Sequence, residues 1–218
     1  MELIFEQICA GGDRNFGYLL GDRDAGQGVL IDPSYSPEVF VQRAQDQGLT
    51  ITHVINTHGH PDHTNGNARA VELTLAPVAA FADSSLIRPD VGLVDEQEFD
   101  VGGLRLQFLH VPGHCPDHLV IFEPSWRIVI TGDLLFVGKV GGTTDDDDAR
   151  IEWASLQRLL RRLPDDVTVW PGHDYGVRPS STIGLEQATN PFLRCADLAA
   201  FLALKRDWPV VKRRLGLK

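Results

Sequence analysis

The chain has few cysteines: Cys9, Cys115 and Cys195 are the only three among its 218 residues. They are odd in number and widely spaced, so they predict neither a disulfide framework nor a CxxC metal site. No apolar run reaches the roughly 18 residues that a membrane-spanning helix needs. The acidic start, Met1 to Glu6, lacks the positive segment of a signal peptide. We therefore expect a cytoplasmic protein.

The chain also lacks an excess of positive charge, because its formal net charge is −10. A nucleic-acid partner would require a basic face, and an anionic membrane surface would repel this chain. No Ser-His-Asp pattern stands out either. We expect a small-molecule substrate, no nucleic-acid partner and no membrane partner, and leave a homodimer open.

The length and composition fit one soluble domain, with 43% hydrophobic and 23% charged residues. Strand-like runs lie at residues 2–9, 15–20, 28–31, 51–56, 78–80, 104–111, 118–122, 127–131 and 167–170. Helical spacing lies at residues 36–47, 65–75, 151–163 and 185–204, the last broken at Asn190-Pro191. Two facing sheets with helices outside satisfy this order. We expect one domain over residues 1–218 with a short helical C-terminal extension over about 192–218.

The most informative stretch is Thr57-His58-Gly59-His60-Pro61-Asp62-His63, directly after the strand-like run 51–56. A lone histidine there would be an ordinary core or surface residue. Three histidines and one aspartate within six residues are instead typical of a metal site, since imidazole and carboxylate ligands suit zinc, iron or manganese.

Other polar residues also follow strand-like runs. Pro112-Gly113-His114, Thr131-Gly132-Asp133 and Pro171-Gly172-His173 each come after an apolar segment. Because strand ends can converge along one edge of a sandwich, these residues are predicted to join the histidine motif in one site.

Together these motifs resemble the metallo-β-lactamase-fold hydrolases, over most of residues 10–190. Within that superfamily the chain looks most like the glyoxalase II (hydroxyacylglutathione hydrolase) and persulfide dioxygenase branch. The resemblance implies an α/β fold, an αββα sandwich of two mixed sheets flanked by helices, with a two-metal site at one edge. By motif, one metal would be held by His58, His60 and His114, the other by Asp62, His63 and His173, with Asp133 bridging them.

The implied activity is hydrolysis of a thioester or related activated ester by a metal-bridging hydroxide, which Asp62 would orient. Two divalent ions sharing a water can lower its pKa and stabilise the charge on the attacked carbonyl. We expect zinc first, with iron or manganese as alternatives. A mononuclear non-haem iron persulfide dioxygenase and a lactonase stay open. A nuclease of this fold would need a basic groove, and a non-catalytic metal-dependent scaffold is the non-enzyme alternative.

The chain departs from glyoxalase II after Asp133. The basic and aromatic residues that hold glutathione there correspond to Gly142 and Thr144 here. Most of the long helical C-terminal domain of glyoxalase II is also lacking. The acidic run from Asp145 to Asp148 is predicted to be a solvated loop; alternatives are a pocket mouth that disfavours polyanions and, more weakly, a Ca²⁺ site.

Three residues beside the motifs are further candidates. Tyr175 keeps the aromatic that follows the last histidine in this branch, and is predicted to contact substrate. His118 is predicted to support a ligand from behind. Cys115 is predicted to pack beside the site as a small residue, with an oxidation-prone thiol as the alternative.

Overall fold

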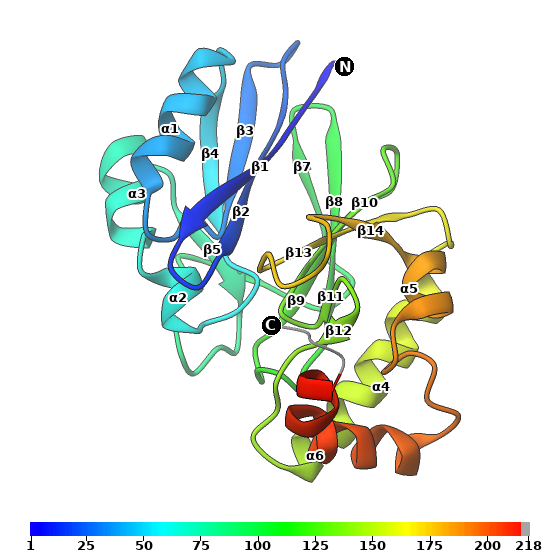
Figure 1. Cartoon of the computed structure of the whole chain (residues 1–218). Coiled ribbons are helices and arrows are strands. Elements are labelled where there is room, and N and C mark those ends of the chain that lie inside the picture. The colour runs from blue at the N-terminus through cyan, green and yellow to red at the C-terminus, as the bar shows by residue number, and fades with distance from the viewer. Residues whose placement is uncertain (215–218) are drawn as a thin grey trace.

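A computed structural model describes residues 1–214, which form two facing six-stranded sheets with helices on both outer sides (Figure 1). Both sheets are mixed, because each contains parallel and antiparallel neighbours. The predicted αββα sandwich is therefore confirmed. Within residues 1–214, no helix combines the length and apolar character that crossing a membrane would require.

The first sheet has the spatial order β1-β2-β3-β4-β5-β6 and the second β14-β13-β10-β9-β8-β7. A two-stranded ribbon, β11-β12, forms a third, separate sheet. The strand bounds are β1 (Leu3–Gly11), β2 (Asn15–Asp22), β3 (Gln27–Ile31), β4 (Thr50–Ile55), β5 (Val78–Phe81), β6 (Val91–Leu93), β7 (Glu98–Val101), β8 (Leu104–His110), β9 (Leu119–Glu123), β10 (Ile128–Gly132), β11 (Leu135–Phe136), β12 (Lys139–Val140), β13 (Thr168–Pro171) and β14 (Ser181–Thr182).

Helices α1 and α3 cover the first sheet, and α4 to α6 lie on the side of the second (Figure 1). Their bounds are α1 (Pro37–Asp46), α2 (Pro61–Thr64), α3 (Asn67–Thr74), α4 (Asp146–Arg162), α5 (Ile183–Thr189) and α6 (Leu198–Arg214). Strands β2 and β10, neither of which lies at a sheet edge, are buried along their whole length, because each has one face toward the other sheet and one toward helices.

Three apolar layers hold the sandwich together. The middle layer joins the inner faces of the sheets and includes Tyr18, Phe108 and Ile130. The outer layers contain Phe40 under the helices of the first sheet and Phe201 under those of the second. Neighbours along β2 alternate between layers, since Leu19 belongs to the outer cluster and Leu20 to the middle one. This packing fixes where the strand ends lie.

The acidic run is the main local departure from expectation. Asp145 caps α4, its carboxylate accepting a hydrogen bond from the Asp148 backbone N–H at 2.9 Å. The next three aspartates form the first turn, where negative charge complements the helix dipole. The predicted loop is therefore wrong, although Asp145 and Asp147 are exposed to solvent.

Candidate metal centre

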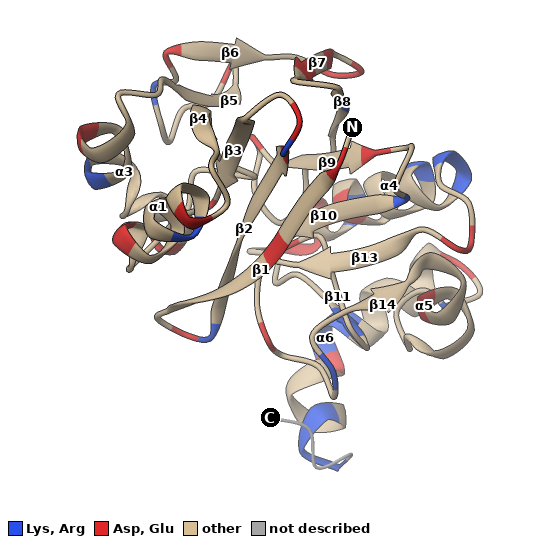
Figure 2. Cartoon of the chain, turned by 90° about the horizontal axis from the view of Figure 1, so that it is seen from above, with Lys and Arg blue, Asp and Glu red and all other residues tan. Residues whose placement is uncertain are grey.

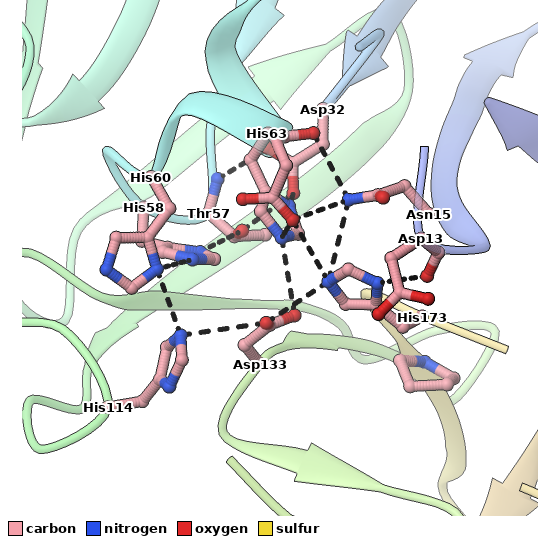
Figure 3. Close-up of polar contacts among 12 residues, drawn as sticks. Asp13, Asn15, Asp32, Thr57, His58, His60, His63, His114, Asp133 and His173 are labelled. Atoms are coloured by element: carbon pink, nitrogen blue, oxygen red, sulfur yellow. Dashed lines mark hydrogen bonds and ion pairs between the residues drawn. The ribbon is translucent and has the colours of Figure 1, made fainter. Parts of the chain in front are cut away.

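The seven predicted ligands come from the ends of four strands and from the helical turn α2, and the six that Figure 3 labels point toward one another. His58 and His60 follow β4, and α2, a single helical turn, carries Asp62 and His63. The remaining three, which follow β8, β10 and β13, are His114, Asp133 and His173. The loop after β4 and helix α2, on the side of the first sheet, thus meet the loops after β8, β10 and β13 of the second sheet at one edge of the sandwich.

Three groups of these side chains have ligand atoms within 4.8 Å of one another, and each group could hold a metal ion. They are His58, His60 and His114; Asp62, His63 and His173; and His58, His63 and Asp133. In the first group, His60 Nδ1 lies 3.0 Å from His58 Nε2 and 3.1 Å from His114 Nε2. Three ring nitrogens facing one point are typical ligands of a borderline-soft cation.

Asp133 lies between the first and second groups. Its Oδ2 is 3.6 Å from His114 Nε2 on one side and 3.2 Å from His173 Nε2 on the other. Its Oδ1 is 3.4 Å from His63 Nε2. One carboxylate can therefore reach a cation in either group.

Two buried polar atoms in this cluster support the fit of a metal. Within residues 1–214, neither His63 Nε2 nor Asp133 Oδ1 has a hydrogen-bond partner. Such atoms are costly to bury unless something else binds them. A divalent cation is the partner that this mixture of imidazole nitrogen and carboxylate oxygen suits best.

The charges of the site depend on burial and on neighbouring carboxylates. Burial lowers the pKa of His58 far below its ordinary value, so this imidazole is neutral. Burial would also lower the pKa of His173, but Asp133 and Asp62 outweigh it and raise that pKa to about 9. Cations bound here would displace such protons from the imidazoles.

Asp32 supports the centre from behind, and the sequence did not single it out. Its carboxylate accepts hydrogen bonds from His63 Nδ1 at 2.9 Å, and from Thr57 N at 2.9 Å and Thr57 Oγ1 at 2.6 Å. An imidazole that donates one N–H to a carboxylate presents its other nitrogen as a ligand. The signal was available, since Asp32 follows β3 as the ligands follow their strands.

The β1–β2 turn contributes further support from a distant part of the chain. Asn15 Nδ2 donates to Asp62 Oδ2 at 3.0 Å, and His173 Nδ1 donates to the backbone oxygen of Asp13 at 2.9 Å. These partners lie 47 and 160 residues apart in sequence. No local pattern could have predicted them.

His118 and Cys115 both lie beside the ligands. His118 Nε2 accepts the backbone N–H of Asp133 at 3.0 Å, and its ring stacks on that of His58 at 4.9 Å. Cys115 Sγ donates to Asp117 Oδ1 at 2.8 Å, and Asp117 also accepts the Gly59 N–H of the histidine motif. Burial first, and then Asp117, raise the pKa of Cys115 to about 12, which keeps the thiol protonated.

Two glycines are required by close approach. A Cβ on Gly172 would lie 2.3 Å from Asp133 Oδ1. Gly113 has φ of +136°, and a Cβ there would lie 2.4 Å from the Glu152 Cα. The glycines preceding His173 and His114 therefore let these segments reach the centre.

A cavity of about 320 Å³ opens beside the ligands and includes Tyr175 in its wall. The Tyr175 ring stacks parallel to that of His173 at 4.6 Å, and its hydroxyl donates to Asp13 Oδ2 at 2.6 Å. The ring thus faces the cavity while the hydroxyl is already bonded. Arg14, Lys139 and Lys212 also line this cavity.

The C-terminal helix α6 is tied to the loop that orients His114. His114 Nδ1 donates to the backbone oxygen of Gly142 at 2.7 Å. The neighbouring Gly141 oxygen accepts from Lys205 Nζ at 2.6 Å, and Lys205 also pairs with Glu152 of α4 at 2.6 Å. Glu152 is fully buried, and burial raises its pKa to about 7 although Lys205 lowers it.

The family model of the Metallo-beta-lactamase superfamily matches residues 10–84 and 79–173. The hydroxyacylglutathione hydrolase of Polaromonas sp. is 35% identical over 178 residues, covering 79% of this chain and 67% of that protein. The crystal structure of ETHE1 from Myxococcus xanthus superposes with a TM-score of 0.86 at 32% identity, covering 94% and 91% of the two chains. TTHA1623 in a di-iron-bound form gives a TM-score of 0.71 at 32% identity, covering 86% of this chain and all of that one.

Proposed function

The chain belongs to the metallo-β-lactamase superfamily, and from this membership we propose a glyoxalase II-like, dinuclear metal-dependent hydrolase that cleaves a thioester or related activated ester. The observation that carries the proposal is the pair of ligand groups with Asp133 between them. A relative named hydroxyacylglutathione hydrolase and a di-iron-bound structural neighbour support it.

In this proposal, His58, His60 and His114 would hold one ion, Asp62, His63 and His173 would hold the other, and Asp133 lies where it could serve either group. When bound, two divalent ions would polarise the scissile carbonyl and lower the pKa of a shared water. Zinc is our first expectation, with iron or manganese as alternatives.

Asp62 is proposed to orient the attacking hydroxide. Its pKa is held far below the ordinary carboxyl value, first by the hydrogen bond with His173 and, against some desolvation, by Asn15. Its side chain is 35% exposed, in contrast to the 10% of Asp133. Asp62 is thus an ionised carboxylate that substrate and water can reach. Asn15 fixes its orientation through Oδ2.

The test combines metal content with turnover. We expect close to two metal ions per chain and release of thiol from a panel of small thioesters. His114→Ala and Asp133→Ala should each lose more than about 100-fold in kcat/KM, because each removes a ligand. His53→Ala is the matched control, since His53 packs against Phe99 away from the centre. Near-wild-type turnover in either ligand variant would overturn the assignment.

A mononuclear iron persulfide dioxygenase is the second candidate, supported by the similarity to ETHE1 from Myxococcus xanthus. The loop after Asp133 does not favour it, since Gly141-Gly142-Thr143-Thr144-Asp145 lacks the arginine that persulfide dioxygenases usually have there. One iron per chain, with oxygen consumption on a persulfide and no thioester turnover, would establish it. Cytoplasmic location, a homodimer and the absence of nucleic-acid partners remain proposals.

A further inference from the structure

Positive charge gathers at the cavity beside the metal centre, although the chain as a whole carries a net charge of −10. Arg14 comes from the β1–β2 turn, Lys139 from β12 and Lys212 from α6, and all three line the cavity of about 320 Å³ that includes His114 and Asp133. Figure 2 shows the basic stretch near the end of α6. Three separate segments thus place cations in the same cavity as the predicted ligands His114 and Asp133.

Lys139 is held in place on an aromatic wall. Its Nζ lies 3.6 Å from the centroid of the Tyr175 ring and 5.1 Å from that of Phe136. Arg14 lies over the same Tyr175 ring at 4.9 Å. The stem of Lys139 is half-buried, so its ammonium group projects from a built wall and not from a mobile surface chain.

The lysines differ in whether a carboxylate neutralises them. Lys205 pairs with Glu152, and its neighbour Arg206 pairs with Asp146. Within residues 1–214, neither Lys139 nor Lys212 has a carboxylate within ion-pair distance. Burial first, and then the charge of Lys212, lower the pKa of Lys139 to about 8. Two lysines that form no ion pair with a carboxylate favour a bound anion, although Asp13 and Asp133 also line this cavity.

We propose that Lys139 and Lys212, assisted by Arg14, bind a carboxylate of the substrate, so that this chain prefers thioesters carrying a single carboxylate close to the scissile carbonyl. The inference rests on the proposed function and deepens it. The residues replace the glutathione contacts that are missing at Gly142 and Thr144. Asp13 in the same cavity wall disfavours anions of higher charge.

The test compares acids with their uncharged amides. One pair of thioesters has a succinyl or succinamoyl group on a neutral thiol, and a second pair carries the carboxylate or amide on the thiol instead. We expect the wild type to prefer the acid in at least one pair by roughly 10-fold or more in kcat/KM, typical of one charge-assisted hydrogen bond.

Lys139→Met and Lys212→Met should each reduce that preference while changing kcat/KM for the amide less than about threefold. Lys139→Arg should retain it. Arg43→Met, which removes an exposed cation of α1, controls for net charge. Equal turnover of acid and amide by the wild type in both pairs, or an unchanged preference in Lys139→Met, would overturn the carboxylate site.

Binding separates this proposal from the hydrolase itself. Thioether analogues of the same acids and amides cannot be hydrolysed, and their affinities are measured by calorimetry. Tighter binding of the acid that depends on Lys139, with no thioester turnover, would support the site and refute the hydrolase. Thioester turnover without any preference for the acid, in rate or in binding, would support the hydrolase and refute the carboxylate site.

Discussion

Lys205→Met should make the stability of the protein fall more steeply with pH above pH 7. Among the described residues, Lys205 is the cation that pairs with the fully buried carboxylate of Glu152. The pKa of Glu152 is about 7 with Lys205 present, against an ordinary value of 4.5, because burial outweighs the lysine. Without Lys205 that pKa rises further, so Glu152 stays protonated in the folded protein.

The sign and size follow from proton linkage. In the wild type the folded state binds more protons than the unfolded state between about pH 4.5 and 7. The free energy of unfolding therefore falls as pH rises through this window and levels off above it. In Lys205→Met it continues to fall by about 1.4 kcal/mol per pH unit. Loss of the hydrogen bond to the Gly141 oxygen adds roughly 1 kcal/mol at every pH.

The assay is urea unfolding of wild type and variant at pH 6, 7 and 8. We expect a difference of roughly 1 kcal/mol at pH 6 that increases by about 1.4 kcal/mol between pH 6 and pH 8, most of it above pH 7. The Glu152→Gln/Lys205→Met double variant lacks the titrating carboxyl and should show no such increase. A destabilisation of equal size at pH 6 and pH 8 would refute the reasoning.

Three further outcomes are expected. Asp32→Asn should weaken metal affinity by roughly 10–100-fold, because His63 loses the carboxylate that orients it; unchanged affinity in competition with a chromophoric chelator would contradict this. Gly172→Ala should lose metal and activity while remaining folded by circular dichroism, since its Cβ would press on Asp133; full metal content would count against the packing described. Removal of metal by a chelator should lower Tm by roughly 8–16 °C for each ion that was present at about 1,000 times its Kd, and an unaltered Tm would show that the ions do not stabilise the fold.

The larger elements were predictable because their periodicity is local. The runs expected at residues 104–111 and 51–56 correspond to β8 and β4, and the helix expected from residue 36 is α1. Short strands such as β6, β11 and β14 were missed, because two or three residues carry no period. The break expected at Asn190-Pro191 within the helical stretch 185–204 is confirmed as the end of α5, whereas α6 begins only at Leu198 and continues through Pro209.

The ligand set was accessible to sequence analysis, and its surroundings were not. His58, His114 and His173 could be predicted to lie together because each follows the end of an apolar strand within a few residues, and such strand ends can converge at one edge of the sandwich. Asp32 obeys the same rule but has no histidine beside it. Lys139 and Lys212 lie in segments without a motif, and only the packing of α6 against the β11–β12 region places both at one cavity.

The two lysines of the cavity wall lie in segments that carry no ligand. Ligands occupy residues 58–63, 114, 133 and 173, whereas Lys139 belongs to β12 and Lys212 to α6. Substitution of these lysines removes no contact with a ligand ring, in contrast to Phe136 and Tyr175, which pack on His173. Exchanging only residues 139 and 212 for those of a relative should therefore transfer substrate preference, because Lys205 stays in place and still ties α6 to the loop that orients His114.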